Sequence, residues 1–165
     1  MRESEHEFIE SLDEMETFLD ENQLGNLGLV DGERPYVVPL NYSYHGGGRI
    51  LFHCALEGKK LDLIRRNPNV SFTVAKQYEA VRPHGPGDEC HVDSDSVMCF
   101  GTARIIDDPG ERATKLNEFN RFYRPNADDI AAEYVAGCGV VEITIREMTG
   151  RHERERERTL WRWRF

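Results

Sequence analysis

Hydrophobic and polar residues follow two different rhythms in the first third of the chain. Between residues 4 and 21, apolar side chains recur every three or four positions and form the stripe of an amphipathic helix. Further on, short apolar runs rich in Val and Tyr are separated by the turn signals DG at 31–32 and HGGG at 45–48. The pattern predicts an N-terminal helix followed by strands at residues 26–31, 35–44 and 49–55.

Helices enter the pattern in the second half of the chain. A short helix is predicted at residues 57–66, where Asn67-Pro68 ends it. The other predicted elements are strands at residues 70–76, 96–106 and 139–148 and helices at residues 111–123 and 128–136. This order favours an antiparallel or mixed barrel with helices packed outside over a doubly wound parallel sheet. We expect a single domain over residues 1–165, with an N-terminal helix up to residue 22 and a C-terminal extension from residue 150.

The C-terminal extension has an unusual composition. From Gly150 onward it holds six arginines and three glutamates, which gives this segment a local excess of positive charge. Trp161, Trp163 and Phe165 alternate with arginines, so an extended strand would place the three aromatic rings on one face. One interpretation is a solvated tail. The other is a terminal strand that docks its aromatic rings on a neighbouring subunit or near a planar ligand, since rings this large are costly to expose.

Composition narrows the function classes. The 165 residues are 39% hydrophobic and 31% charged, with a net charge of -9 and a pI of about 5.2, as in a soluble globular protein. An acidic surface argues against general binding of nucleic acids or anionic membranes. No apolar stretch approaches the length of a membrane span, and the N-terminus is charged where a secretory signal would be apolar. We therefore expect a cytoplasmic protein with reduced cysteines.

The cysteines give no metal-binding pattern. Cys54, Cys90, Cys99 and Cys138 contain no CxxC pair. The nearest approach to a ligand set is His84, Cys90 and His91, within a long loop predicted at residues 78–95. Exposed loop residues are the better interpretation, and no metal is predicted.

The most informative stretch covers residues 35–74. The helix predicted after residue 57 begins near Lys59 and Lys60, so two ammonium groups meet the free N–H groups and positive partial charge of a helix N-terminus. The strands before it offer an apolar wall for a flat ring, formed by Pro39, Leu40, Phe52 and Ala55. A phosphate site beside a flat apolar wall suits a mononucleotide, although lysine pairs at helix starts are often only solvated.

Several ordered segments of the chain resemble a known family. They are YVVPLNY at residues 36–42, FHCALEGKK at 52–60, NPNVSFTV at 67–74, SVMCFGTA at 96–103 and EITIREMTG at 142–150. Together they resemble the pyridoxamine 5′-phosphate oxidase-like FMN-binding split barrels, and most closely the nitroimidazole reductase-related branch. The resemblance implies a mainly β (α+β) fold, namely a Greek-key-like antiparallel split β-barrel with peripheral helices. It also implies a homodimer that holds FMN, or alternatively FAD, at its interface.

The resemblance assigns roles to individual residues. Along the flavin ring it places Val38, Pro39, Leu40 and Asn41, and around the ribityl chain and ring it places His53, Cys54 and Ala55. Lys59 and Lys60 take the place of the basic pair that grips the phosphate, and Ser96 and Val97 reach the cofactor from the partner chain. Trp161 and Trp163 correspond loosely to a C-terminal Trp and Arg near the ring.

The resemblance implies a flavin-dependent oxidoreductase. The expected partner is a small electron acceptor such as a nitroaromatic compound, and His53 is the candidate proton donor. A core histidine satisfied by the backbone is the competing interpretation of His53. Lys59-Lys60 and His53-Cys54 depart from the Arg-Lys pair and polar strand of the true oxidases, whose C-terminal substrate-binding pattern is also missing. The alternatives are a non-catalytic module that binds flavin, haem or deazaflavin, and a dimer with an empty site.

Overall fold

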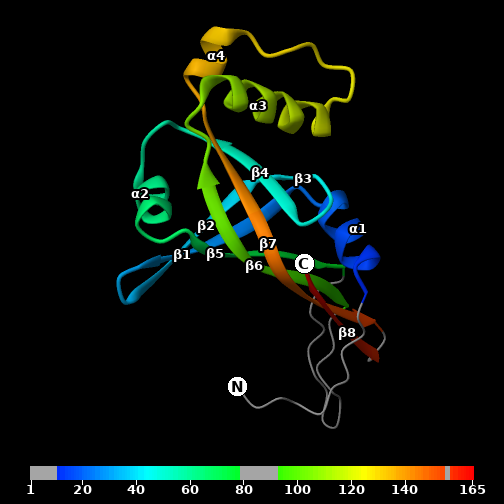
Figure 1. The fold of residues 1–165 in the computed structure, drawn as a ribbon. Helices are drawn as coiled ribbons and strands as arrows, with labels where there is room; N and C mark the ends of the chain where they lie inside the picture. The colour runs from blue at the N-terminus through cyan, green and yellow to red at the C-terminus, as the bar shows by residue number, and fades with distance from the viewer. Residues whose placement is uncertain (1–10, 79–92, 155–156) are drawn as a thin grey trace.

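The computed structural model describes residues 11–78, 93–154 and 157–165 of the chain. Its eight strands form one antiparallel sheet in the order β2-β1-β5-β6-β7-β4-β3, and β8 pairs with β7 (Figure 1). The strands are β1 (Leu24–Asp31), β2 (Arg34–Asn41), β3 (Ser43–Tyr44), β4 (Arg49–Cys54), β5 (Asn69–Gln77), β6 (Ser94–Ile105), β7 (Gly139–Arg154) and β8 (Glu157–Arg164). The helices are α1 (Asp13–Glu21), α2 (Lys59–Arg66), α3 (Pro109–Tyr123) and α4 (Ala132–Ala136).

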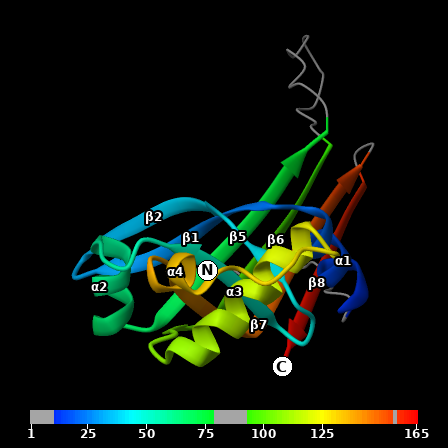
Figure 2. The same cartoon turned by 90° about the horizontal axis from the view of Figure 1, so that it is seen from above.

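The connection between β2 and β3 explains why the sheet curls. These two strands stand at opposite ends of the strand order, yet only Tyr42 separates them in the sequence. The edges of the sheet must therefore approach each other, and Tyr42 is fully buried where they meet. This gives the mainly β split barrel with peripheral helices that the sequence predicts (Figures 1 and 2).

The long strand β7 joins the two ends of the molecule. Its first half pairs with β4, from Gly139 opposite Cys54 to Thr144 opposite Arg49, and its second half pairs with β8. Strand β6 has a bulge at Gly101, because its register against β7 shifts between Phe100 and Gly101. A Cβ on Gly101 would lie 2.1 Å from the carbonyl oxygen of Thr144, so only glycine fits this close approach.

Two hydrophobic clusters hold the helices to the sheet. The interior of the barrel is filled by fully buried side chains that include Phe52, Phe72 and Met15 of α1. A smaller cluster, which includes Ile106 and Leu116, lies under α3 and α4. The predicted helix at residues 111–123 is confirmed as α3, which begins at Pro109 because the Asp108 side chain accepts a hydrogen bond from the Glu111 N–H at 2.7 Å.

Helix boundaries differ from the sequence-based expectation at two places. Of the helix predicted at residues 4–21, the structure describes only residues 11 to 21, of which Asp13 to Glu21 are helical; residues 1–10 lie outside the described residues, as does most of the predicted loop at 78–95. The helix predicted at residues 128–136 begins only at Ala132. The Asn117 side chain accepts the N–H of Ile130 at 2.8 Å, and Asp129 pairs with Arg121, so tertiary contacts hold this segment out of a helix.

Candidate functional site

The start of α2 has the backbone geometry expected of an anion site. Lys59 and Lys60 are its first two residues, and the residue before them, Gly58, has φ +139° and ψ 163°. The positive φ favours glycine at this turn. The N–H of Leu61 already bonds the Gly58 carbonyl at 2.9 Å, which leaves the earlier N–H groups of the first turn without helical partners. The helix thus brings free N–H groups and two lysines together at one point.

The two lysines at this turn differ in their partners. The Lys59 Nζ lies 2.8 Å from Asp31 Oδ2 and 4.9 Å from the centre of the Tyr36 ring. The hydrogen bond from Lys59 holds the pKa of Asp31 below its ordinary value. Lys60 has no ion pair with any residue that the structure describes, and its charge acts on the Cys54 thiol. Lys60 is therefore the more available cation, whereas Lys59 ties α2 to Asp31 of β1 and to Tyr36 of β2.

Along strand β2, successive side chains point alternately toward the barrel interior and away from it. Val38 and Leu40 pack against the core, whereas Pro39 and Asn41 are exposed, and Asn41 donates to the Gln23 carbonyl at 2.9 Å. Of the four residues predicted along a flavin ring, only these two present side chains to the outside. Sequence reasoning missed Val37, which is 62% exposed on the same outer face, although the alternation of the strand is the signal that places it there.

The residues predicted on β4 also divide between two faces. Cys54 packs against the barrel core, where burial raises the pKa of its thiol, and Ala55 is exposed just after the strand ends. His53 lies on the opposite face from Phe52, with its ring edge-on to Phe119 of α3 at 4.8 Å. Burial lowers the pKa of His53, and its ring makes no hydrogen bond with a described residue. This histidine is available to a ligand rather than satisfied by the backbone.

The remaining predicted residues lie at the other end of the molecule. Val97 and Trp161 pair with Gly150 of β7, whereas His53 pairs with Val140. Ten residues of strand separate these two positions, or about 33 Å along β7. Figures 1 and 2 show α2 and β8 on opposite sides of the molecule. One chain therefore holds two half-sites: the α2 half-site, with the residues predicted on β2, β4 and α2, and the β8 half-site, with Ser96, Val97, Trp161 and Trp163.

The aromatic residues of β8 face their own chain. Trp161 and Trp163 pack against the barrel core and stay partly exposed, so a solvated tail does not describe these rings, and their contact with a second subunit stays a prediction. The close approach of Trp161 to β7 needs Gly150, since a Cβ there would lie 2.8 Å from the indole. Phe165 instead packs on Gly48 at the turn before β4. Val97 is 1% exposed, which leaves Ser96 and the edge of Trp161 as the accessible part of the β8 half-site.

A groove of about 480 Å³ opens beside Trp161, between α1 and the far ends of β5 to β8. Ser96, Val97 and Trp161 line it together with residues that sequence reasoning missed, among them Phe18 and His152. The His152 Nδ1 lies 2.8 Å from Asp95 Oδ1, and the His152 ring lies 5.6 Å from that of Trp161. The contact between Asp95 and His152 could have been predicted from the pairing of β6 with β7, because that pairing places Asp95 opposite His152.

Three kinds of comparison relate the chain to known proteins. The family model described as pyridoxamine 5′-phosphate oxidase matches residues 11–152. A candidate 5-nitroimidazole antibiotic resistance protein from Bacteroides thetaiotaomicron is 28% identical, with a TM-score of 0.74 over 86% of this chain and 84% of that one. An FAD-binding protein from Mesorhizobium loti is 26% identical, with a TM-score of 0.65 over 88% of this chain and 95% of that one.

Two further relatives are more limited in what they show. An FAD- and haem-binding protein from Mycobacterium smegmatis is 13% identical, with a TM-score of 0.76 over 94% of this chain and 83% of that one, which is a likeness of fold alone. An uncharacterised protein of Rhizobium meliloti (strain 1021) is 32% identical over 68 residues, which are 41% of this chain and 44% of that protein. The match thus spans less than half of that relative. Among the described residues, no helix is long and apolar enough to cross a membrane.

Proposed function

The chain belongs to the pyridoxamine 5′-phosphate oxidase family, and on that premise we propose that it is a flavin-dependent oxidoreductase that binds FMN between two copies of itself. The observation that carries the proposal is the start of α2. There Lys60, without an ion-pair partner among the described residues, and the free N–H groups after Gly58 lie beside Lys59, whose Nζ is 4.9 Å from the centre of the Tyr36 ring on β2. An anionic group bound at this turn would leave a flat ring beside Pro39 and Asn41.

The dimer follows from the separation of the two half-sites. A two-fold symmetric pair can bring the α2 half-site of one chain against the β8 half-site of the other, which one chain alone cannot do over about 33 Å. Ser96 and Trp161 would then approach the cofactor from the partner chain. The single terminal phosphate of FMN matches one helix start, which favours FMN over FAD, although FAD is named for the relative from Mesorhizobium loti.

In such a site the flavin supplies the transfer of electrons or hydride to a small electrophile. The protein binds the phosphate through Lys60, orients the ring through the backbone of β2, and presents His53 beside it. Because burial lowers the pKa of His53, its imidazole is mostly neutral near pH 7 and gains a proton as the pH falls. We expect a nitroaromatic acceptor, a choice supported by the resemblance to the candidate 5-nitroimidazole resistance protein.

The test starts from the protein as purified. The small molecule released on denaturation is identified by mass spectrometry and absorbance, and the mass of the particle is measured by light scattering. The proposal predicts FMN, a dimer, and reoxidation of the reduced flavin by a nitroaromatic compound. A monomer without any flavin, which also takes up none when FMN is added, would contradict it.

A non-catalytic flavin carrier is the second candidate, supported by the relative described only as FAD-binding. In that case the bound flavin would stay oxidised with NADH, NADPH or another reductant present, or would not pass its electrons on. The role of His53 is tested separately with His53→Ala. Unchanged reduction kinetics with the flavin still bound would remove His53 from the reaction.

A further inference from the structure

The groove beside Trp161 has the size of a ligand site. Its volume of about 480 Å³ lies within the range of about 300–1,000 Å³ that is usual for small-molecule pockets. Residues from three segments far apart in the sequence line it, namely α1, the facing ends of β5 and β6, and the paired strands β7 and β8. The groove is therefore a product of the tertiary fold and not of one loop.

Aromatic rings form the walls of this groove. Phe18 comes from α1, Tyr78 follows β5, and Trp161 comes from β8. The indole of Trp161 is held in place, because it packs on Gly150 on one side and lies near the His152 ring at 5.6 Å on another. Tyr78 donates to Asp95 at 2.8 Å, which orients its ring in turn. The walls thus offer fixed π faces rather than adaptable side chains.

The acidic side chains among the described lining residues outnumber the basic ones. Asp13, Glu14 and Glu21 of α1 line the groove, and no lysine or arginine lines it among the described residues. None of these three carboxylates forms an ion pair with any residue that the structure describes. Glu21 even stands in the last turn of α1, where the helix dipole disfavours a carboxylate and where basic residues are absent.

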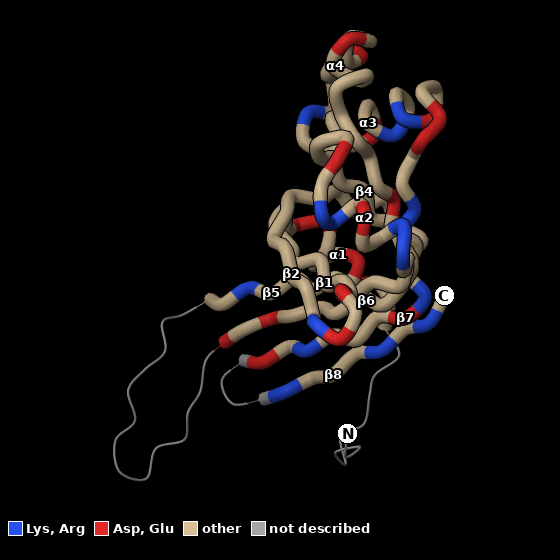
Figure 3. Tube along the Cα trace, turned by 90° about the vertical axis from the view of Figure 1, so that its left-hand side faces the viewer, with Lys and Arg blue, Asp and Glu red and all other residues tan. Residues whose placement is uncertain are grey.

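Basic residues do lie nearby, on β7 and β8 (Figure 3), but their partners are elsewhere. Arg151 and Arg158 both pair with Glu153, and Arg164 pairs with Glu147. The fourth carboxylate of the groove, Asp95, is held by His152 and Tyr78. Lys76 does not line the groove, but its Nζ lies 5.0 Å from the centre of the Tyr78 ring and covers one face of that ring. The α1 carboxylates themselves have no ion-pair partner among the described residues, so their negative potential acts on the groove.

We propose that this groove binds a small organic cation that carries an aromatic ring or a quaternary ammonium group. A cation over the Trp161 ring gains a cation–π attraction that increases when it is desolvated. The α1 carboxylates add attraction for the cation and repel an anion. Binding itself does not depend on the proposed function. Because Ser96 lines the groove and belongs to the β8 half-site, a bound cation would lie beside the flavin, a placement that rests on the proposed function.

Calorimetric titration of the purified protein with benzyltrimethylammonium tests the proposal. Benzyl alcohol serves as the neutral control, and benzenesulfonate serves as the anion of similar size. We expect the cation to bind at least about tenfold more tightly than either control, since both the rings and the carboxylates discriminate. Equal affinity for benzyl alcohol or for benzenesulfonate would overturn the proposal.

Matched variants locate the binding. Glu14→Gln combined with Glu21→Gln should weaken cation binding about three- to tenfold, whereas Asp20→Asn, on α1 but outside the groove, should change it less than about twofold. Trp161→Phe keeps an aromatic ring against the core and should weaken binding about threefold, because Trp is the strongest partner for a cation. Equal effects of Asp20→Asn and the double variant would place the cation elsewhere and overturn the proposal.

The flavin content of the same samples separates the two proposals. Cation selectivity in protein that neither contains nor takes up flavin would count against the proposed function alone. Flavin-loaded protein that does not distinguish the cation from benzyl alcohol would count against the groove proposal alone.

Discussion

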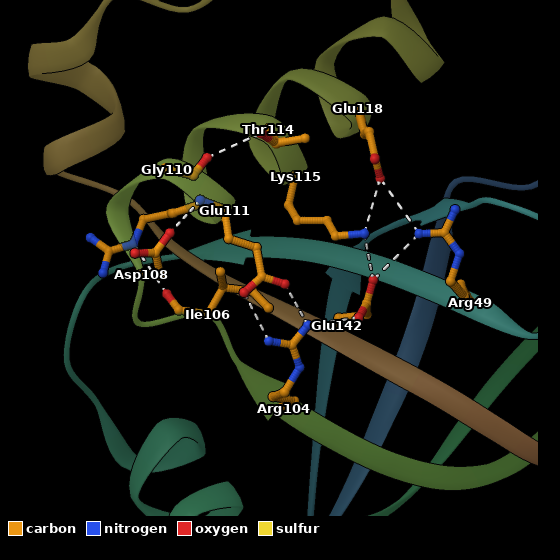
Figure 4. Close-up of polar contacts among 11 residues, drawn as sticks. Arg49, Arg104, Ile106, Asp108, Gly110, Glu111, Thr114, Lys115, Glu118 and Glu142 are labelled. Carbon is orange, nitrogen blue, oxygen red and sulfur yellow. Dashed lines mark hydrogen bonds and ion pairs between the residues drawn. The ribbon is translucent and has the colours of Figure 1, made fainter.

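The carboxylates under α3 and those along the groove face of α1 have opposite surroundings. Beneath α3, Glu142 of β7 is 9% exposed and lies 2.9 Å from Lys115, 3.0 Å from Arg104 and 3.4 Å from Arg49 (Figure 4). Along the groove, no carboxylate of α1 has a cationic partner among the described residues. The carboxylate under α3 thus anchors a helix, whereas the carboxylates along the groove create a negative electrostatic potential that can attract a ligand.

Helix α1 carries both behaviours on its two faces. Glu16 accepts hydrogen bonds from the Tyr44 hydroxyl and from the Gly47 N–H, which fixes the helix to the turn before β4. Glu21, on the groove face, accepts none from a described residue. The difference teaches that a carboxylate used for structure acquires donors within the fold. A set that lacks them in an aromatic groove is a candidate for recognition.

The largest effect should come from removing the α3 anchor. Glu142→Gln leaves Lys115, Arg104 and Arg49 without their central carboxylate, and we expect a loss of about 2–3 kcal/mol in the free energy of unfolding. Glu21→Gln, the matched change in the groove, should leave stability within about 0.5 kcal/mol or raise it slightly. Denaturant unfolding measures both. Equal losses of unfolding free energy in the two variants would contradict the difference between the α3 anchor and the groove carboxylates.

The same contrast predicts a dependence on pH. Burial raises the pKa of Glu142, but hydrogen bonds from Lys115 and Arg104 outweigh it and hold the pKa below its ordinary value of 4.5. A carboxyl with a lowered folded-state pKa contributes stability that is fully present above its unfolded-state pKa and is lost as the pH falls through the folded-state pKa. The stability gap between the native protein and Glu142→Gln should therefore narrow as the pH falls below 4.5. A gap that widened in acid would contradict this assignment.

The same distinction between paired and unpaired charges applies to the two lysines at the start of α2. Lys59 already pairs with Asp31, whereas Lys60 has no ion pair in the described chain. We expect Lys60→Gln to weaken FMN binding about tenfold and Lys59→Gln only about two- to threefold, because a bound phosphate must compete with Asp31 for Lys59. Fluorescence titration with FMN measures both affinities. A larger effect at Lys59 would show that the phosphate displaces Asp31.

The smallest expected difference between the groove and the region under α3 is in how strongly each responds to salt. Between about 0.05 M and about 0.5 M NaCl, screening of the exposed α1 carboxylates should weaken cation binding in the groove a few-fold. The stability difference between the native protein and Glu142→Gln should change by less than about 0.5 kcal/mol, because the Lys115–Glu142 pair at its centre is largely buried. Calorimetry and denaturant unfolding at both salt concentrations test this. Salt-independent cation binding would contradict an electrostatic contribution from α1.

Local patterns were enough to predict most of the fold. Strand alternation and turn signals located β1, β2 and β4, and the fold class and family are confirmed by the structure and the comparisons. The shortened α4 could not be predicted, because its boundary depends on the Asn117 side chain of another helix. The inward packing of Trp161 and Trp163 depends on pairing with β7, and a strand with arginines between tryptophans does not specify which face is buried.

The site was predicted only in part for a similar reason. The resemblance identified residues of both half-sites, and their roles toward a cofactor stay predictions. It also assigned Ser96 and Val97 to the partner chain's side of the cofactor, but it could not give the distance between the two half-sites of one chain, which is set by the length of β7. The groove was missed altogether, because Phe18, Asp95 and His152 are distant in the sequence and meet only in the folded sheet.

The central claim is that the start of α2 binds the phosphate of FMN. The most direct measurement compares the affinities for FMN and riboflavin, which differ only by that phosphate, in the native protein and in Lys59→Gln/Lys60→Gln. We predict that the native protein prefers FMN by at least about tenfold and that the double variant binds both nearly equally, with riboflavin affinity unchanged. A double variant that keeps the full preference for FMN would contradict the account.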